Sequence, residues 1–283
     1  MPGLLERSIT RVDKRLILLA PPKKVVPPVF ENVERSLNQH LGRLTEVQRL
    51  RGTIYWHDGA IGPNDLSQGG LHRTPEDEKA WHLLMTNQQG RVTSCVWYIE
   101  HHEAPSLNKL RVRDCPAGLR HESKDVFWKA VESDLQTARR EQLRYAEIGG
   151  WAVAKELRHT TEGLVLALAA FSFGRMFGGA LGMTTATVRH SSSNILRRLG
   201  GSHLEVDGTP VAPYYDPKYG CLMEVLRFDS RRPSAKYGGL IDMLMEKLAR
   251  VQVIAQTARV TKLPLPMTAR SFLPDARSGR ATA

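Results

Sequence analysis

The chain has 283 residues, a length that can bury one large hydrophobic core. Its apolar fraction of 41% and its charged fraction of 24% are ordinary for a globular protein and exclude wholesale disorder. The formal net charge of +11 favours an anionic partner. Composition leaves four kinds of partner open, namely nucleic acid, a phosphorylated cofactor, an acidic carrier protein and an anionic membrane.

In chain order, residues 1–30 are rich in prolines and predict an extended arm. Residues 30–50 carry apolar side chains at helical spacing and predict a helix. Residues 52–57 predict a strand, and residues 58–70 predict a loop rich in Gly, Asn and Pro.

The middle of the chain alternates strands and helices. Residues 81–85 and 92–98 predict two strands joined by a turn, and residues 100–120 predict a long connection. An amphipathic helix is expected over residues 124–143, with Phe127, Val131 and Leu135 on its apolar face. A strand over residues 145–154 follows it.

The last third continues this alternation. The predicted elements are a helix over residues 164–179, a strand over 183–188, a short helix over 192–199, strands near 203–206 and 221–228, and an amphipathic helix over 237–256. We expect an N-terminal arm and helix over residues 1–50, one main domain over 51–257, and a basic, flexible tail over 258–283.

Cysteine spacing and apolar runs indicate the compartment. Cys95, Cys115 and Cys221 lie far apart without CxxC spacing, which argues against a disulfide framework and favours a reducing compartment. Residues 16–20 form an apolar run that is too short for a signal peptide, so we predict a cytoplasmic protein. Residues 164–181 are apolar but contain Arg175 and three glycines, which predicts a buried helix and no transmembrane segment.

The stretch from Tyr145 to Gly163 is the most informative part of the sequence. A half-apolar strand carries one carboxylate, Glu147, and runs into a turn of small residues that opens a helix. The turn and the helix start read Arg158-x-x-Thr161-x-Gly163. Free backbone N–H groups at a helix N-terminus suit a phosphate group, and a nearby carboxylate suits the removal of a proton.

This order of elements resembles the Gcn5-related N-acetyltransferase (GNAT) fold over about residues 51–229. The family motif has Arg or Gln, two residues, Gly, one residue, and Gly or Ala; in this chain threonine replaces the middle glycine. The implied fold class is α+β, with a mixed, mostly antiparallel central sheet flanked by helices and with extra N- and C-terminal helices. Glu147 lies eleven residues before Arg158, the spacing of the catalytic glutamate in histone-type members.

The long insertion before the Glu147 strand makes the chain similar to acyl-homoserine-lactone synthases and N-acyl amino acid synthases. Arg51-Gly-Thr-Ile-Tyr55 is similar to an Arg-x-x-x-Phe element of those enzymes. Two departures argue against a homoserine-lactone product. Gly150 stands where the lactone synthases have arginine, and Trp97-Tyr98 stands where they have Arg-Leu. An N-acyl amino acid synthase-like activity is what the resemblance then implies.

The resemblance implies a role for each part of the central motif. Glu147 is expected to act as general base for the attacking amine, and the backbone N–H of Val153 to bind the thioester oxygen. Arg158, Thr160, Thr161 and Gly163 are expected to bind the phosphates of the cofactor. The alternatives are a salt-bridged strand glutamate and a plain helix start, with Thr160 or Thr161 as N-cap and Glu162 complementing the helix dipole.

Arg51, Tyr55 and Trp151 are expected to bind substrate. The expected co-substrate is acyl-CoA or acyl-phosphopantetheine, with an acyl carrier protein as the partner and a small-molecule amine as the acceptor. Arg189, Arg197 and Arg198 are candidates for contact with a carrier protein or a terminal phosphate. No metal is expected, because His101-His102-Glu103 lacks a complementary ligand pair.

Two alternatives stay open on the sequence. One is an acetyl-CoA-dependent N-acetyltransferase. The other is a catalytically silent domain of the same fold whose basic surface binds nucleic acid; no helix-turn-helix or aromatic RNA-binding motif supports it, and nucleic acid is not the expected partner.

Overall fold

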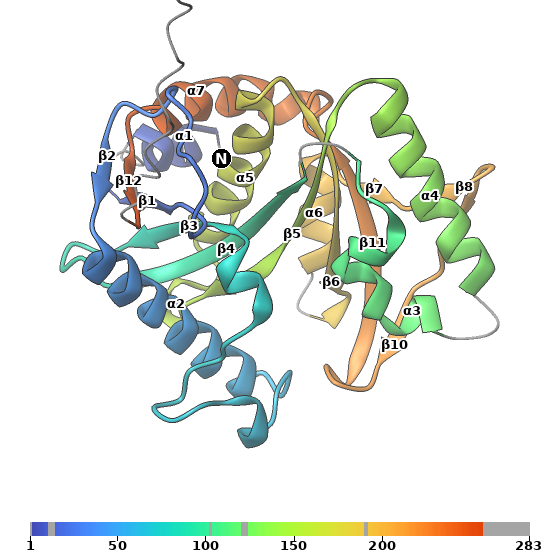
Figure 1. The fold of residues 1–283 in the computed structure, drawn as a ribbon, viewed down its shortest axis with the longest axis horizontal. Helices are drawn as coiled ribbons and strands as arrows, with labels where there is room; N and C mark the ends of the chain where they lie inside the picture. The colour runs from blue at the N-terminus through green and yellow to red at the C-terminus, as the bar shows by residue number, and fades with distance from the viewer. Residues whose placement is uncertain (1, 11–14, 102–103, 120–123, 190–191, 257–283) are drawn as a thin grey trace, which may run out of the picture.

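The computed structural model describes residues 2–10, 15–101, 104–119, 124–189 and 192–256. A large, mostly antiparallel sheet runs through the molecule, with helices on both of its faces (Figure 1). This architecture is consistent with the α+β, GNAT-like fold that the sequence predicts, and α2 and α7 correspond to the extra helices expected near its two ends.

Strands and helices alternate along most of the chain. The strands are β1 (Leu16–Leu19), β2 (Val33–Arg35), β3 (Trp81–Thr86), β4 (Val92–His101), β5 (Arg144–Val153), β6 (Ala180–Thr187), β7 (Ser202–His203), β8 (Glu205–Val206), β9 (Thr209–Pro210), β10 (Tyr214–Asp216), β11 (Cys221–Asp229) and β12 (Gln252–Ala255). The α-helices are α1 (Pro2–Thr10), α2 (Leu37–His57), α3 (Pro116–Leu119), α4 (Lys124–Arg140), α5 (Glu162–Met176), α6 (Ser192–Leu199) and α7 (Gly238–Leu248). Short 3-10 helices include η3 (Pro75–Glu78), η5 (Arg111–Asp114) and η6 (Lys155–Leu157).

The strand order in the sheet is β10-β11-β6-β5-β4-β3-β1-β12-β2, with β7 beside β11. The pairs β5–β6, β1–β12 and β12–β2 are parallel, and the other pairs are antiparallel. The long helix α5 connects the parallel strands β5 and β6, as a parallel pair requires.

Two layers of helices bury the sheet. On one face, α1, α5 and α7 pack over a core that includes Leu166, Phe173 and Ile241. On the other face, α2 packs over β4, β5, β12 and β1, and α4 packs over β5, β6 and the short strand β8. Phe127, Val131 and Leu135 of α4 are fully buried, which confirms the predicted apolar face of that helix.

The central elements agree with the sequence prediction. The hairpin β3–β4, the helix α4, the strand β5, the helix α5, the strand β6 and the helix α6 all form within a few residues of the expected bounds. The late strands are also present as β7, β8 and β11.

The predicted strand over residues 52–57 is wrong, because these residues form the last turns of α2. The helix begins at Leu37, after the N-cap Ser36, whose hydroxyl accepts from the Gln39 N–H at 3.3 Å. Gly52 lies inside the helix, where a Cβ would overlap the Gly70 carbonyl oxygen. This glycine therefore permits a loop to pack closely on the helix, and it does not mark a helix end.

The expectations for the two ends of the chain are wrong in a related way. The first thirty residues are no extended arm, because they contain α1 and the buried strand β1. The predicted helix over residues 237–256 ends at Leu248, and β12 follows it. The apolar residues of β12 lie between two parallel neighbours, β1 and β2, and such strands are apolar on both faces.

Residues 258–283, the predicted flexible tail, lie outside the described residues, which end at Gln256. Among the described helices, none combines the length and the apolar character needed to cross a bilayer. The three cysteines are free thiols, and Cys95 and Cys221 are buried.

Candidate functional site

The centre of the candidate site is a bulge in β5. The register between β4 and β5 shifts between Cys95 and Trp97, so that β5 holds one extra residue there. Gly150 in this bulge has a φ of +63°, a left-handed conformation that favours glycine. The parallel pairing of β5 with β6 ends at the pair Glu147–Met183, so the two strands separate beyond that point.

The register places the backbone N–H of Val153 on the open side of β5. The Ala154 N–H donates to the Thr93 oxygen at 2.8 Å, and Val153 lies opposite Ser94. In an antiparallel ladder, the residues next to a hydrogen-bonded pair point their N–H groups the other way. The Val153 N–H therefore points away from β4, toward the side on which β6 has separated. It is oriented as the resemblance implies for an oxygen-binding donor.

A cavity of about 520 Å³ opens beside this strand end. Its walls come from β5, the start of α5, the start of α6 and the end of α2. The residues with predicted roles that line it are Tyr55, Trp151, Val153, Arg158, Thr160 and Gly163. The structure thus brings most of the predicted site together at one opening.

The walls of the cavity carry more positive than negative charge. Arg158, Arg189 and Arg198 line it, and Asp58 is the acidic residue of the lining. The Arg158 guanidinium donates to the Asp58 carboxylate at 2.6 Å, and Arg189 donates to the Asp58 backbone oxygen at 2.9 Å. Arg197 lies elsewhere, because its guanidinium bonds the Asn194 side chain. The cavity is therefore suited to an anionic ligand.

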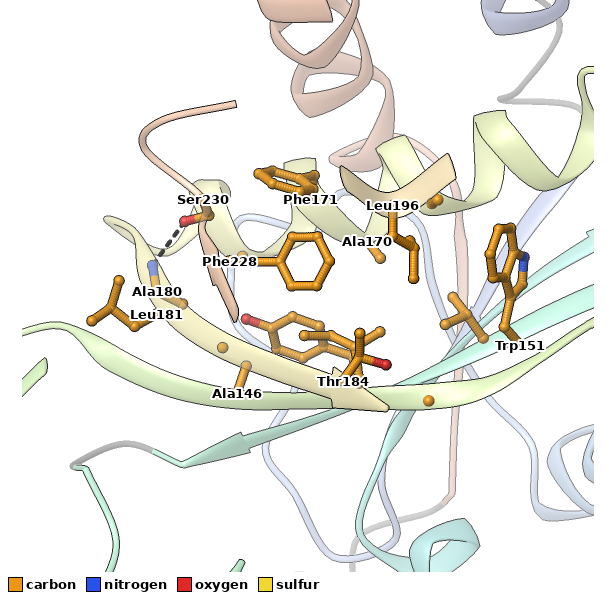
Figure 2. Close-up of a pocket in the computed structure, with 17 residues that line it drawn as sticks. Ala146, Trp151, Ala170, Phe171, Ala180, Leu181, Thr184, Leu196, Phe228 and Ser230 are labelled. Carbon is orange, nitrogen blue, oxygen red and sulfur yellow. Dashed lines mark hydrogen bonds between the residues drawn. The ribbon is translucent and has the colours of Figure 1, made fainter. Parts of the chain in front are cut away.

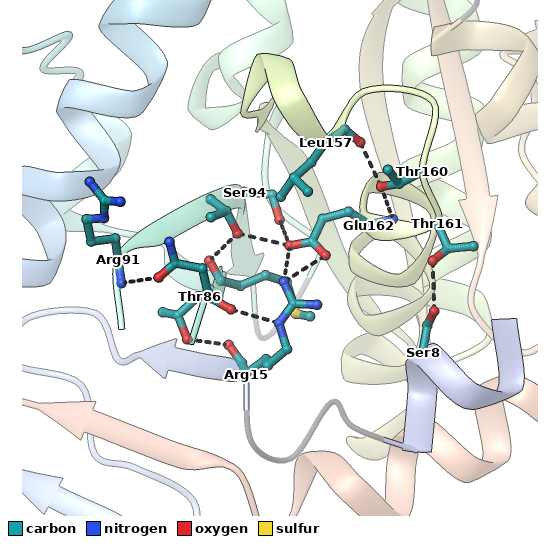
Figure 3. Close-up of polar contacts among 12 residues, drawn as sticks. Ser8, Arg15, Thr86, Arg91, Ser94, Leu157, Thr160, Thr161 and Glu162 are labelled. Carbon is teal, nitrogen blue, oxygen red and sulfur yellow. Dashed lines mark hydrogen bonds and ion pairs between the residues drawn. The ribbon is translucent and has the colours of Figure 1, made fainter. Parts of the chain in front are cut away.

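The start of α5 is fixed by an ionic and hydroxyl network (Figure 3). Glu162 accepts two bonds from the Arg15 guanidinium at 3.0 Å and one from the Thr93 hydroxyl at 3.0 Å. The Glu162 N–H donates to the Thr160 hydroxyl at 3.2 Å. The Thr161 hydroxyl pairs with Ser8 of α1 at 2.8 Å, so it is turned toward α1 and does not line the cavity. Arg15, which precedes β1, and Ser8 of α1 thereby hold the first turn of α5 in place.

Gly163 permits a close approach of helix and strand. A Cβ at this position would lie 3.2 Å from Trp151 Cζ2 and 3.3 Å from Val153 Cγ2, closer than ordinary contacts. The glycine therefore lets the start of α5 come against β5. This explains the glycine by helix–strand packing, in addition to the expected approach of a ligand.

Glu147 lies on the opposite face of β5 from α5, and it is buried. Its carboxylate accepts from the Val112 backbone N–H at 3.2 Å and lies 3.2 Å from His101 Nε2. Arg111 lies over the indole of Trp97, with 5.6 Å between its guanidinium carbon and the ring centroid. Glu147 does not line the large cavity, so its expected role as a base requires access from the face of α2 and η5.

The two departures from the lactone synthases meet on this face. A Cβ at Gly149 or at Gly150 would overlap the indole of Trp97. The indole thus covers the backbone where the lactone synthases carry an arginine side chain, and a larger residue at 150 would not fit beside it.

Arg51 lies at the centre of a buried polar cluster. Its guanidinium donates to both Asp77 carboxylate oxygens at 2.6 and 2.8 Å, and to the His72 backbone oxygen at 3.0 Å. Burial lowers the pKa of His72 to about 4, and it lowers the pKa of the neighbouring His82 to about 4. All these partners are protein groups, so the structure gives Arg51 a place in holding α2 against the η3 loop.

Tyr55, one turn further along α2, is nearer the cavity. Its hydroxyl donates to the Trp151 backbone oxygen at 3.4 Å, and its ring packs edge-on against His72. Burial raises the pKa of the Tyr55 hydroxyl above its usual value, so this group stays a neutral hydrogen-bond donor.

A second cavity, of about 60 Å³ and mostly apolar, lies between α5 and strands β5 and β6 (Figure 2). Its lining contains many small residues, including Ala146, Ala170, Gly174 and Gly182. Trp151 lines both cavities. The helix α5 forms one side of this space, and Phe171 lines it.

The residues of the large cavity that the sequence does not single out include Asp58, His159 and Tyr219. Asp58 and Tyr219 lie in loops distant in sequence from the central motif, and no local pattern marks them. His159 has a φ of +66°, a conformation that the sequence does not reveal.

No group of three or more His, Cys, Asp or Glu side chains suited to a metal ion occurs among the described residues. Residues 102 and 103 of the His-His-Glu run lie outside them.

No protein-family model and no curated protein matches the chain. Solved structures with a similar fold include BjaI, a CoA-dependent acyl-homoserine lactone synthase crystallised with SAM and isopentyl-CoA. It is 15% identical, with a TM-score of 0.48, over 86% of this chain and 92% of its own. FeeM, an N-acyl amino acid synthase from uncultured soil microbes, is 13% identical, with a TM-score of 0.44, over 77% of this chain and 92% of its own.

Arylalkylamine N-acetyltransferase 2 from Aedes aegypti is 13% identical, with a TM-score of 0.42, over 69% of this chain and 96% of its own. At these identities and TM-scores, the likenesses carry no argument about the reaction or the substrate.

Proposed function

We propose that this protein is an N-acyltransferase that moves an acyl group from a thioester of coenzyme A or phosphopantetheine to an amine. The observation that carries the proposal is the 520 Å³ cavity at the bulged end of β5, where a backbone N–H, a helix N-terminus and three arginines lie on one opening. The acceptor that the sequence resemblance favours is an amino acid.

The basic wall of the cavity supports binding of the donor's phosphates. The backbone N–H groups at the N-terminus of α5 and the helix dipole attract negative charge. Arg158, Arg189 and Arg198 add positive charge on the surrounding loops and on α6. Thr160 lines the same space, whereas Thr161 and Glu162 act behind it by fixing the helix start to α1 and β1.

The orientation of β5 supports activation of the thioester. A donor whose pantetheine arm lies where β5 separates from β6 would bring its carbonyl oxygen to the Val153 N–H. That N–H would stabilise the oxyanion that develops when the amine nitrogen attacks the carbonyl carbon. The C–N bond forms, the C–S bond breaks, and the sulfur leaves as a thiolate. Thiols have pKa values of about 8.5, so the thiolate can leave without being protonated by a strong acid.

The amine must lose one proton in this reaction. Glu147 is the proposed acceptor of that proton, directly or through water, with His101 beside its carboxylate at 3.2 Å. Tyr55 and Trp151 are proposed to bind the substrate where α2 meets β5. Arg51 is proposed to act indirectly, because its bonds to Asp77 hold the helix that carries Tyr55.

An acyl carrier protein is the proposed donor partner, in preference to free acyl-CoA. Carrier proteins are acidic, and the net charge of +11 together with the arginines at the cavity favours an acidic partner.

Calorimetric titration with CoA, together with an assay of thiol release from acyl-CoA in a mixture of amino acids, tests the proposal. We expect binding by the native chain, at least about tenfold weaker binding by Arg158→Gln, and thiol release that depends on the amine. Arg49→Gln is the matched control, because Arg49 is exposed on α2 outside the cavity lining. Absence of amine-dependent thiol release from both acyl-CoA and an acylated carrier protein would overturn the proposal. Salt-sensitive binding to DNA in its place would identify a nucleic-acid-binding protein.

A further inference from the structure

The apolar cavity has the character of a site for a short alkyl group. It lies on the α5 side of the sheet, where β5 and β6 separate, and most of its lining is carbon (Figure 2). The Ser230 hydroxyl, one of its few polar groups, already accepts from the Ala180 N–H at 2.8 Å. The space therefore offers little to a polar ligand and suits a hydrocarbon.

The volume of the cavity limits the length of such a group. One water molecule needs about 10–15 Å³ of cavity volume, and a methylene group is similar in size to water. A cavity of 60 Å³ thus holds about four to six carbons. A longer chain would extend out of this space, where it buries no further apolar surface, or displace the side chains that line it.

Aromatic side chains oppose further extension. Phe171 and Phe228 line the cavity and pack edge to face, with 5.3 Å between their ring centroids. Tyr98 packs against Phe173 at 5.1 Å, and a Cβ at Gly174 would lie 2.9 Å from the Tyr98 hydroxyl. Densely packed aromatic rings do not yield space without a cost in free energy.

Trp151 lies where the two cavities meet. Among the described residues, it alone lines both of them. The Tyr55 hydroxyl holds its backbone oxygen, and the close approach of Gly163 fixes one edge of its ring. In Figure 2 the indole nitrogen lies on the ring edge turned away from the other residues of the apolar cavity. The carbon face of the indole therefore forms part of the apolar wall.

The indole N–H is buried and has no hydrogen-bond partner among the described residues. A buried donor without an acceptor costs free energy, and such groups are uncommon in proteins. A carbonyl oxygen of a ligand placed at the junction would satisfy it.

We propose that Trp151 determines which acyl groups the protein accepts. Its indole face and the apolar cavity behind it select an alkyl tail of about four to six carbons, and its N–H is a second donor, beside the Val153 N–H, to the carbonyl oxygen of the acyl group. This inference rests on the proposed acyl transfer, and it adds the substrate class and the residue that sets it.

The test measures the binding of free CoA and of acetyl-, butyryl-, hexanoyl-, octanoyl- and dodecanoyl-CoA by calorimetry. For the native chain we expect affinity to rise about fourfold for each methylene up to hexanoyl-CoA, as burial of a methylene predicts, with no further gain for octanoyl- or dodecanoyl-CoA. Equal affinities for acetyl- and hexanoyl-CoA, or a gain that continues to dodecanoyl-CoA, would overturn the proposal.

Two variants of Trp151 separate its role as an apolar wall from its role as an N–H donor. Trp151→Ala removes the wall and should extend the gain in affinity to octanoyl-CoA or beyond. Trp151→Phe keeps the wall but lacks the N–H, so it should keep the length limit and bind every acyl-CoA more weakly relative to free CoA. The matched control is Trp56→Ala, since Trp56 is 59% exposed and lines neither cavity, and it should keep the native profile. An unchanged profile in Trp151→Ala would contradict the proposal.

A second variant keeps the test decisive if Trp151→Ala does not fold. Ala170→Leu enlarges a side chain that lines the cavity and should move the limit down to butyryl-CoA. An unchanged limit in this variant would also overturn the inference. An activity assay distinguishes the two proposals: absence of amine-dependent thiol release from both acyl-CoA and an acylated carrier protein would count against the proposed acyl transfer itself, whereas an unchanged length profile counts against the role of Trp151 alone.

Discussion

The two faces of β5 differ in how they are packed. Toward α5, the strand presents small and apolar side chains such as Ala146, and an apolar cavity remains beside them. Toward α2 and α4, its polar side chains are fixed by partners: the Tyr145 hydroxyl donates to Asp134 at 3.0 Å, and Glu147 holds the Val112 N–H. Free space thus lies on one face and fixed polar geometry on the other. A transfer reaction needs both, because the acyl group must fit a space while the proton acceptor must keep its position.

The largest effect on turnover should come from Glu147, on the face of β5 that is turned toward α2 and α4. Glu147→Gln keeps an oxygen for the Val112 N–H but removes the proposed base, so turnover should fall by about 10²–10⁴-fold with a smaller change in the Michaelis constant. The loss should shrink at high pH, where the amine is already deprotonated. Steady-state kinetics from neutral to alkaline pH measure this, with the exposed-helix variant Glu132→Gln as control. Near-native turnover at neutral pH would assign Glu147 a purely structural role.

The buried polar cluster around Arg51 should have a large effect on the free energy of unfolding. Arg51→Leu leaves the Asp77 carboxylate buried without its cation, which typically costs about 3–5 kcal/mol in the free energy of unfolding. Urea denaturation measures the change. The double variant with Asp77→Asn should recover part of it, and Arg49→Leu on the exposed side of α2 should change little. Equal stabilities of Arg51→Leu and Arg49→Leu would show that the ion pair does not hold α2.

The same cluster should make stability depend on pH. His72 and His82 have folded-state pKa values of about 4, because burial disfavours their charged forms, whereas an unfolded histidine titrates near about 6.5. Between these values the unfolded chain binds more protons, so stability falls as the pH drops from about 6.5 toward about 4. Each unit of depression contributes about 1.4 kcal/mol.

Urea denaturation at about pH 7.5, 6 and 5 should therefore show decreasing free energies of unfolding. The double variant His72→Asn/His82→Asn should have a flatter profile over the same range. A native chain that is equally stable at both ends of this range would contradict the depressed pKa values.

A substitution at the contact between α5 and β5 should have a smaller effect. In Gly163→Val, the new side chain would press on Trp151 and Val153, and such overpacking costs about 1–3 kcal/mol. We expect CoA to bind about tenfold more weakly to the folded variant, because Val153 and the helix start would separate. The matched control is Gly42→Val in α2, where a Cβ meets no atom within 4 Å. Unchanged CoA affinity in the folded Gly163 variant would remove the helix start from the donor site.

The central half of the fold could be predicted because its local signals agree with its tertiary contacts. The hairpin β3–β4, the amphipathic helix α4 and the strand β5 each show their own periodicity. The ends failed where partners distant in the chain decide the structure: β12 is a strand because it lies between β1 and β2, which come from the other end of the chain. Residues 52–57 resemble a strand locally, but the packing of α2 keeps them helical.

The residues of the candidate site also differ in whether the sequence could predict them. Val153, Arg158 and Gly163 could be selected because the family resemblance rests on a motif that is continuous in the sequence, and all three line the large cavity. Asp58 and Tyr219 come from distant loops, and only the folded chain brings them to the cavity. The resemblance of Arg51-Gly-Thr-Ile-Tyr55 to an element of the synthases singles out Arg51, yet its ion pair with Asp77 shows that it supports α2 from within.

The smallest expected effect is on the rate of acyl transfer from different thioester donors. Arg189 and Arg198 line the large cavity, whereas Arg197 bonds Asn194 away from it. Reversing Arg189 and Arg198 to Glu should slow transfer from an acyl carrier protein by about tenfold or less, and added salt should reproduce the loss in the native chain. Acyl-pantetheine lacks both the carrier protein and the nucleotide of CoA, so the rate of acyl transfer from it should change least in this variant.

The exposed pair Arg49 and Arg250, reversed together, controls for net charge. Rates with carrier protein, acyl-CoA and acyl-pantetheine then separate the sources of the effect. Since a carrier protein presents many acidic groups and CoA only its phosphates, salt should slow the carrier-protein reaction more steeply than the acyl-CoA reaction. Equal salt dependence for the two donors would indicate that the arginines bind the phosphates of CoA and that the basic surface serves no carrier protein.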